Sequence, residues 1–119
     1  MKRNPRKYDP DHLAFVRTLS CCICRDNTSV EAAHIRMSDA RIAKQNPGVG
    51  QKPSDCFALP LCGKHHREQH SMGNEHEFWF KHRIDPVLTS LAIYSVSGDA
   101  EQAERIIQPS VTNLIKGEA

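Results

Sequence analysis

The segment Cys62-Gly-Lys-His-His-Arg-Glu-Gln-His70 decides how the rest of the chain is interpreted. Within it, Cys62 and His65 form a C-x-x-H pair, and Cys21 and Cys24 form a C-x-x-C pair far upstream. Two such pairs on tight turns can close a tetrahedral zinc site of three thiolates and one imidazole. We therefore expect these four side chains to bind a structural Zn²⁺; an unmetallated core cluster is the alternative interpretation.

The same segment carries two further histidines, His66 and His70. They are four residues apart, so on a helix they share one face and can bind a second divalent ion. The segment is not the H-E-x-x-H motif of zinc proteases, because Glu68 stands at the third position and not directly after His66. His34 lies between the two zinc pairs, and closure of the zinc site would bring it toward His66. A neutral imidazole beside a metal-bound phosphate can take a proton from water. The simpler interpretation is a structural His34 and an exposed helical pair.

Apolar runs and turn formers predict a mixed α+β domain. Residues 28–35 and 57–61 are expected to be strands, separated by a polar loop over residues 37–54. Pro60 favours an edge strand. After the strands we expect helices over residues 63–70, 75–82, 87–94 and 99–108, with Phe78, Trp79 and Phe80 anchoring the second of them.

Polar residues mark the expected starts of three helices. Asp11, Asn74 and Asp85 are candidate N-caps, and Pro86 suits a first helical position. Pro5 and Pro10 are expected to break regular structure, so residues 1–10 are interpreted as a flexible basic arm. The remainder, residues 11–119, is expected to be one domain with a core over about residues 21–71 and C-terminal helices over about residues 75–108.

Composition narrows the class of protein. The chain has 119 residues, 39% of them hydrophobic and 25% charged, which fits one small globular domain. No apolar run approaches the roughly 18 residues of a membrane-spanning helix. The N-terminal residues lack the pattern of a secretion signal, so we expect an intracellular protein. Five cysteines without such a signal favour metal binding over disulfides, and we expect Cys22 and Cys56 to be core thiols.

Charge is unevenly distributed along the chain. Residues 1–83 contain 14 Lys and Arg against 9 Asp and Glu, whereas residues 84–119 contain 2 against 5. The basic part also contains every Cys and His. This asymmetry is compatible with an anionic partner such as nucleic acid, and equally with an ordinary solvated surface.

The motifs taken together resemble a known family. The order C-x-x-C, then A-H-I-R, then S-D-x-x-A-L-P-L-C-x-x-H-H-x-x-x-H is similar to the zinc-containing HNH nucleases, also called His-Me finger or ββα-metal nucleases. Within them it is most similar to phage and prophage recombination-enhancement nucleases. The similarity runs from about Tyr8 to Pro86. It implies a small ββα-metal core with a structural zinc site, flanked by helices.

The resemblance also implies roles for particular residues. His34 matches the general base, and His66 and His70 match ligands of a catalytic ion such as Mg²⁺. Cys21, Cys24, Cys62 and His65 match the structural zinc cluster. Many relatives have a further ligand just before the base, where this chain has Ala33, and an Asn a few residues before the second Cys pair. Asp55 is the nearest candidate here, either completing the metal shell or orienting His34; a turn-forming role is equally compatible.

The implied function is metal-dependent hydrolysis of a DNA phosphodiester, one strand at a time, in the cytoplasm of a bacterial host cell. Basic residues that could contact phosphates are Arg36, Lys64, Lys2, Arg3, Arg6 and Lys7. A recombinase filament is an expected partner by resemblance only, and no membrane partner is expected.

Three other functions remain compatible with the sequence. A non-catalytic zinc module that binds nucleic acid or protein would explain the zinc ligands but not the other histidines. An RNase or structure-specific nuclease would use the same residues. A redox or zinc sensor would use Cys22 and Cys56.

Overall fold

A computed structural model describes residues 6–47 and 52–117, with side chains described as far as Gln108. In these residues the chain forms a small α+β domain with two antiparallel strands and five α-helices, as the sequence predicted at this level. The elements in chain order are α1 (Pro10–Val16), β1 (Val30–His34), the short 3-10 helix η1 (Ala40–Ile42), β2 (Ala58–Cys62), α2 (Gly63–Met72), α3 (Glu75–Lys81), α4 (Pro86–Ser95) and α5 (Ala100–Gly117).

The two strands set the positions of the predicted site residues. Val30 pairs with Cys62 at one end of the hairpin, and His34 pairs with Ala58 at the other. Cys62 therefore lies at one end of the hairpin and His34 at the opposite end. A sheet of two strands has only edge strands, which is why Pro60, lacking an N–H, is tolerated in β2. The carbonyl of Pro60 accepts a hydrogen bond from the Cys22 N–H at 2.9 Å.

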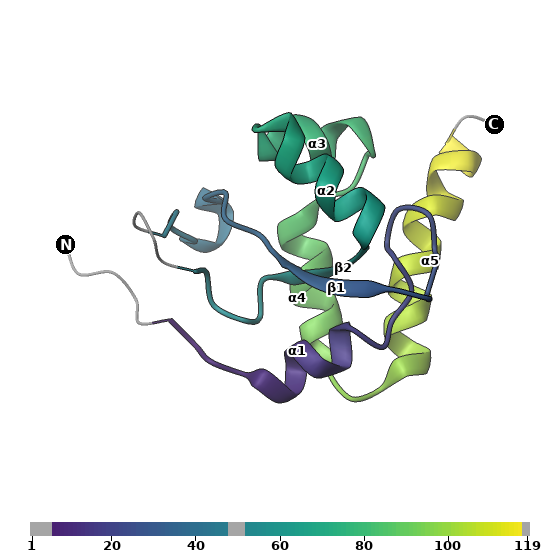
Figure 1. Cartoon of the computed structure of the whole chain (residues 1–119), viewed down its shortest axis with the longest axis horizontal. Coiled ribbons are helices and arrows are strands. Elements are labelled where there is room, and N and C mark those ends of the chain that lie inside the picture. The colour runs from purple at the N-terminus through teal and green to yellow at the C-terminus, as the bar shows by residue number, and fades with distance from the viewer. Residues whose placement is uncertain (1–5, 48–51, 118–119) are drawn as a thin grey trace.

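Helices pack around this hairpin, and β2 is buried more completely than β1. In Figure 1, α2 and α3 lie on one side of the strands, α1 on the other, α4 passes behind them, and α5 flanks the end opposite the N-terminal segment. Every residue of β2 is buried. The largest side chains of the core include Trp79, Phe78, Leu59, Leu61, Ile93 and Ile107.

The helix starts follow local capping chemistry. Asn74 accepts the Glu77 N–H and Asp85 accepts the Leu88 N–H, which confirms both predicted N-caps. The prediction of Asp11 as a cap is wrong. The side chain of Asp9 accepts the His12 N–H, and Pro10 occupies the first helical position, where its missing N–H has no cost.

Two other local predictions differ from the structure. Phe80 is 85% exposed, because three consecutive helical residues cannot all face the core, and Phe78 and Trp79 take that face. The predicted loop 37–54 contains η1, which Asp39 caps by accepting the Arg41 N–H.

Residues 6–9 lie against the domain. The Lys7 N–H donates to Ser54 Oγ at 2.9 Å, and the Asp55 N–H donates to the Lys7 carbonyl at the same distance. The remaining part of the predicted arm, residues 1–5, is outside the described residues. The described helices include none long and apolar enough to cross a membrane.

Candidate functional site

Cys21, Cys24, Cys62 and His65 come together as the sequence predicted. Their ligand atoms all lie within 4.8 Å of one another. The sulfurs of Cys24 and Cys62 are 3.7 Å apart, and His65 Nδ1 is 3.2 Å from Cys62 Sγ and 3.8 Å from Cys21 Sγ. A tetrahedral zinc ion with Zn–S bonds of about 2.3 Å holds its sulfurs roughly 3.8 Å apart. The donor set and its spacing therefore fit a zinc ion.

Backbone geometry presents these ligands. The turn after Cys21 closes through a hydrogen bond from the Arg25 N–H to the Cys21 carbonyl, and Arg25 adopts the left-handed conformation with φ 64°. Cys62 ends β2 and is the N-cap residue of α2, so the helix carries His65 back toward Cys62. The cluster thus links the turn, the hairpin and α2.

The pKa shifts distinguish the ligand His65 from the two cysteines outside the cluster. Burial, helped by the neighbouring His82, lowers the pKa of His65, which favours the neutral imidazole that binds metal. Burial raises the pKa of Cys22 well above its usual value and that of Cys56 in the same direction. Both thiols therefore stay protonated at neutral pH, which disfavours their use as reactive thiolates.

His34 lies at the end of β1 against Asp55. His34 Nε2 is 2.9 Å from Asp55 Oδ1. The side chain of His34 is 17% exposed and that of Asp55 only 3%. Of the two roles considered for Asp55, the contact favours orienting His34.

Asp55 is held by further donors. Arg6 donates to Oδ1 at 2.9 Å, and the Asp9 N–H donates to Oδ2 at 2.7 Å. Burial by itself raises the pKa of Asp55, but the hydrogen bonds from the Asp9 N–H, His34 and Arg6 outweigh it and leave the pKa below its usual value. Asp55 is therefore an ionised carboxylate, a pure acceptor.

The two histidines of α2 lie together, as expected for positions i and i+4. The rings of His66 and His70 have centroids 4.8 Å apart. His66 Nδ1 is paired with the carboxylate of Glu31 on β1. In the part of the chain that the structure describes, the Cys21 cluster is the one group of three or more metal-ligating side chains with closely spaced ligand atoms. A third protein ligand is therefore not assembled with His66 and His70.

The predicted phosphate-contacting residues are dispersed. Arg36 is exposed, and its backbone N–H donates to the Glu75 carboxylate at the start of α3. Lys64 is exposed in the first turn of α2. Arg6 and Lys7 lie beside Asp55, whereas Lys2 and Arg3 are outside the described residues.

Comparison with known proteins identifies one family. Residues 2–95 match the family model described as a protein of unknown function, DUF968. The chain belongs to the DUF968 family. The matched range covers every candidate site residue and ends where α4 ends, so α5 of this DUF968 chain lies beyond it. Searches of curated proteins and of solved structures found no match.

Sequence reasoning on this DUF968 chain missed the partners of the histidines. Glu31 precedes His34 by three positions, and alternation along a strand places it on the face of Ala33, where a ligand was sought. Asp9 was not among the predicted caps or site residues. Its backbone contact with Asp55 joins segments far apart in sequence and leaves no local signal.

Proposed function

We propose that this chain is a metal-dependent DNA endonuclease of the HNH type that hydrolyses one strand at a time. The contact between His34 and Asp55 is the observation that carries the proposal. The order β1, β2, α2 supports it, because it matches the strand–strand–helix order that the resemblance implies. The zinc-compatible cluster at the junction of β2 and α2 supports it further.

The partner of His34 determines which nitrogen can act as a base. An ionised carboxylate only accepts hydrogen bonds, so the neutral ring must carry its proton on Nε2, facing Asp55. Nδ1 then has a free lone pair, and it makes no hydrogen bond with any other described residue. His34 can therefore remove a proton from a water molecule, and the resulting hydroxide would attack phosphorus and displace the 3′ oxygen, leaving a 5′-phosphate and a 3′-hydroxyl end.

Two imidazoles on α2 are the proposed ligands of the catalytic ion. His66 and His70 stack on one face of the helix, with the Glu31 carboxylate at His66. A divalent ion such as Mg²⁺, when bound, would supply positive charge that stabilises the extra negative charge of the transition state. Since the protein provides few ligands, water and phosphate oxygens would complete the shell.

The zinc cluster is proposed to be structural. Four protein ligands leave a zinc ion no open position for substrate. Its proposed role is to hold the turn at Cys21 and the start of α2 in place. We further propose low sequence preference in DNA, a bacterial cytoplasmic setting and, by resemblance alone, cooperation with a recombinase filament.

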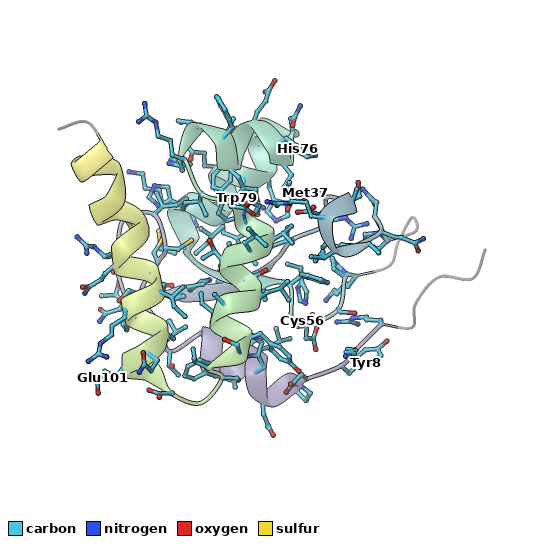
Figure 2. The ribbon with its side chains drawn as sticks, turned by 180° about the vertical axis from the view of Figure 1, so that it is seen from behind. Tyr8, Met37, Cys56, His76, Trp79 and Glu101 are labelled. Atoms are coloured by element: carbon cyan, nitrogen blue, oxygen red, sulfur yellow. The ribbon has the colours of Figure 1, made fainter. Side chains whose placement is uncertain are left out.

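A supercoiled-plasmid assay tests the proposal. Zinc-loaded protein is incubated with plasmid and Mg²⁺, Mn²⁺ or Ni²⁺, beside His34→Ala and a matched control, His76→Ala. His76, labelled in Figure 2, is exposed on α3 and is none of the proposed site residues. Nicking by the wild type and by His76→Ala, but not by folded His34→Ala, is the expected result. No nicking with any metal contradicts the proposal for duplex DNA.

The second candidate is a non-catalytic zinc module that binds nucleic acid or protein. It is favoured by the absence, among described residues, of a third ligand beside His66 and His70. It predicts that zinc content and nucleic-acid binding persist while no substrate is cut. Parallel assays with single-stranded DNA and RNA separate it from a nuclease of different substrate class.

A further inference from the structure

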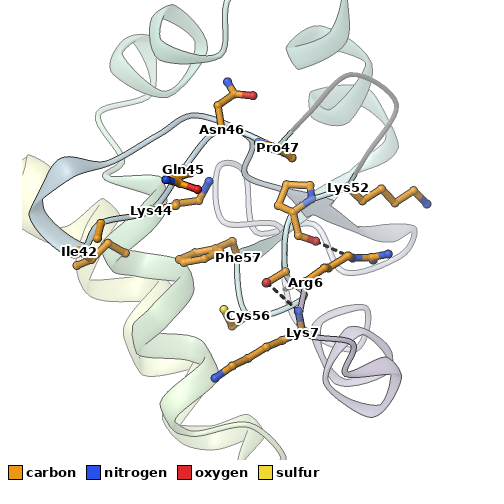
Figure 3. A pocket seen from close by; sticks show the side chains of 13 residues that line it. Arg6, Lys7, Ile42, Lys44, Gln45, Asn46, Pro47, Lys52, Cys56 and Phe57 are labelled. Atoms are coloured by element: carbon orange, nitrogen blue, oxygen red, sulfur yellow. Dashed lines mark hydrogen bonds between the residues drawn. The ribbon is translucent and has the colours of Figure 1, made fainter. Parts of the chain in front are cut away.

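A basic cavity lies beside the contact between His34 and Asp55. Its volume is about 610 Å³, and Figure 3 shows it between the segment at residues 6–7, the segment after η1 and the segment leading into β2. Four cationic residues and no acidic residue are among its described lining residues: Arg6, Lys7, Lys44 and Lys52. A cavity of this size lined by one sign of charge attracts an anion.

Lys44 gives the strongest indication of a ligand. The residue is 8% exposed, yet it forms no ion pair with any described residue. Its ammonium group donates to the Met37 carbonyl at 2.6 Å and lies 4.8 Å from the centre of the Phe57 ring. Burial lowers the pKa of Lys44, and the charges of Glu75 and Asp39, which are not in direct contact with it, offset this only in part. A buried ammonium group with no carboxylate in direct contact is costly. An anion in the cavity would supply that contact.

The other three cationic side chains differ in whether they already have hydrogen-bond partners in the protein. Arg6 Nε donates to the Pro53 carbonyl at 2.9 Å, and its terminal nitrogen donates to Asp55. The side chains of Lys7 and Lys52 are exposed and form no hydrogen bond or ion pair with described residues. Both ammonium groups are therefore available to a ligand.

The cavity and the proposed active site share residues. Arg6 lines the cavity and contacts Asp55, which in turn contacts His34. Phe57 also lines the cavity. Its carbonyl accepts a hydrogen bond at 2.8 Å from the N–H of Ile35, the residue after His34. An anion in the cavity would thus lie next to the end of β1 that carries the proposed base.

From these observations we infer that the cavity binds the backbone of a DNA strand next to the phosphate that is cut. This inference rests on the proposed function, because a polyphosphate strand passing His34 would continue into this cavity. Phosphate groups match several separated cations, and Phe57 adds an apolar surface of the kind found in single-strand binding grooves.

Binding without cleavage tests the inference. A fluorescein-labelled DNA single strand is titrated with zinc-loaded protein, without added divalent ion, at several salt concentrations. Lys7→Ala/Lys52→Ala is compared with Arg17→Ala/Arg105→Ala, which removes equal charge outside the cavity lining. Arg105 pairs with Glu101, which lies on the side of the molecule opposite Cys56 (Figure 2).

The cavity variant is expected to bind about tenfold more weakly, and the slope of its salt dependence should fall by about 0.7 for each phosphate that the protein no longer neutralises. Lys44→Gln, which keeps a donor for the Met37 carbonyl but removes the charge, should also bind more weakly. The control variant, Arg17→Ala/Arg105→Ala, should bind like wild type. Equal binding by the cavity variant, Lys7→Ala/Lys52→Ala, and the control variant would overturn the inference.

Two further arms separate this inference from related alternatives. Inorganic phosphate and ATP are added as competitors; if either binds as tightly as the strand, a free small anion and not DNA is the ligand, and the inference is wrong. Plasmid nicking is measured in parallel on the same protein preparations with Mg²⁺ added. Loss of strand binding in the cavity variant, with no nicking by wild type, supports strand binding in the cavity and contradicts the proposed nuclease activity. Nicking by wild type, with unchanged strand binding in the cavity variant, supports the nuclease and contradicts the inference about the cavity.

Discussion

At the residue scale, the function of His34 depends on Asp55. The carboxylate accepts from His34, Arg6 and the Asp9 N–H, so its removal would free the imidazole to turn and would leave Arg6 without its partner. A change to Asn keeps the size but weakens the preference for a proton on Nε2. Fixing the tautomer of a base is worth orders of magnitude in rate in comparable dyads.

We therefore expect Asp55→Asn to lower the rate of plasmid nicking by about 100-fold or more. The measurement is the initial rate across a pH series, with circular dichroism to verify folding. Asp11→Asn, an exposed change on α1, serves as control and should leave the rate unchanged. A folded Asp55→Asn protein with the rate and pH profile of wild type would show that Asp55 does not position the base.

Residue-level reasoning from the sequence succeeded where spacing alone determines contact. The C-x-x-C and C-x-x-H pairs predicted the Cys₃His cluster, because each pair is presented by one local turn. It left two roles open for Asp55, because a choice between them depends on the register of β1 against β2. His34 pairs with Ala58, three positions after Asp55, and no local pattern specifies that register.

At the scale of elements, the metal cluster joins the turn at Cys21 to β2 and α2. A lean core gains stability from such a link, since a metal bound only by the folded chain adds its binding free energy to folding. Loss of one ligand should therefore affect both metal content and stability.

We expect Cys24→Ala to lose the bound zinc and to unfold at a lower temperature. Cys56→Ala, outside the cluster, should retain one zinc ion per chain and lose little stability. Metal content is measured by mass spectrometry of the purified proteins, and unfolding by circular dichroism. Equal zinc content in the two variants would contradict the assignment of the cluster.

His12 couples α1 to the end of α4. It is 1% exposed, its Nδ1 lies 2.7 Å from Ser97 Oγ, and its ring packs edge-on against Tyr94 at 4.6 Å. Burial lowers the pKa of His12 below the usual value, so the folded protein favours the neutral ring. The unfolded chain then binds the proton more readily, and stability rises with pH.

The contribution of His12 should be fully present above its unfolded pKa, about 6.5. It should be lost progressively as the pH falls below that value. The free energy of unfolding, measured in urea at several pH values with zinc in excess, should decrease more steeply for wild type than for His12→Gln. If the free energy of unfolding varied with pH equally in the two proteins, His12 would not be the source of the pH dependence.

The helix starts illustrate what element-level patterns can predict. Asn74 precedes a helical pattern and Asp85 precedes Pro86, and both predicted caps are confirmed. At α1 only Asp11 was predicted as the cap, whereas Pro10 occupies the first helical position and Asp9 caps the helix. The start of this helix was therefore misplaced, although its existence was predicted.

At the scale of the whole molecule, the Cys₃His cluster and the basic cavity lie at opposite ends of the hairpin. The Cys₃His cluster lies at the end where Val30 meets Cys62, whereas His34 and the basic cavity lie at the other end. This cavity could not be predicted from sequence. Its described lining comes from residues 6–7, 42–47, 52–54 and 56–57, which become neighbours only after folding.

The helix α5 contributes to the whole fold by contacts with distant segments. Ala103 and Ile107 are fully buried in the core, and the Glu104 carboxylate accepts both the N–H and the hydroxyl of Ser20, at 2.8 and 3.1 Å. Ser20 directly precedes Cys21, so α5 fixes the segment that enters the metal cluster. Hydrogen bonds to a charged acceptor contribute more than neutral ones.

Glu104→Ala is therefore expected to destabilise the protein by about 1–2 kcal/mol, because the Ser20 donors lose their acceptor. Glu101→Ala is the matched control: Glu101 is exposed on the same helix and pairs with Arg105, a surface ion pair that contributes little. Urea unfolding with zinc in excess measures both. Since α5 carries no cluster ligand, zinc content should stay unchanged in both variants. A loss of zinc in Glu104→Ala would instead mean that α5 determines the geometry of the cluster itself, and equal stability of the two variants would mean that the contact with Ser20 contributes nothing.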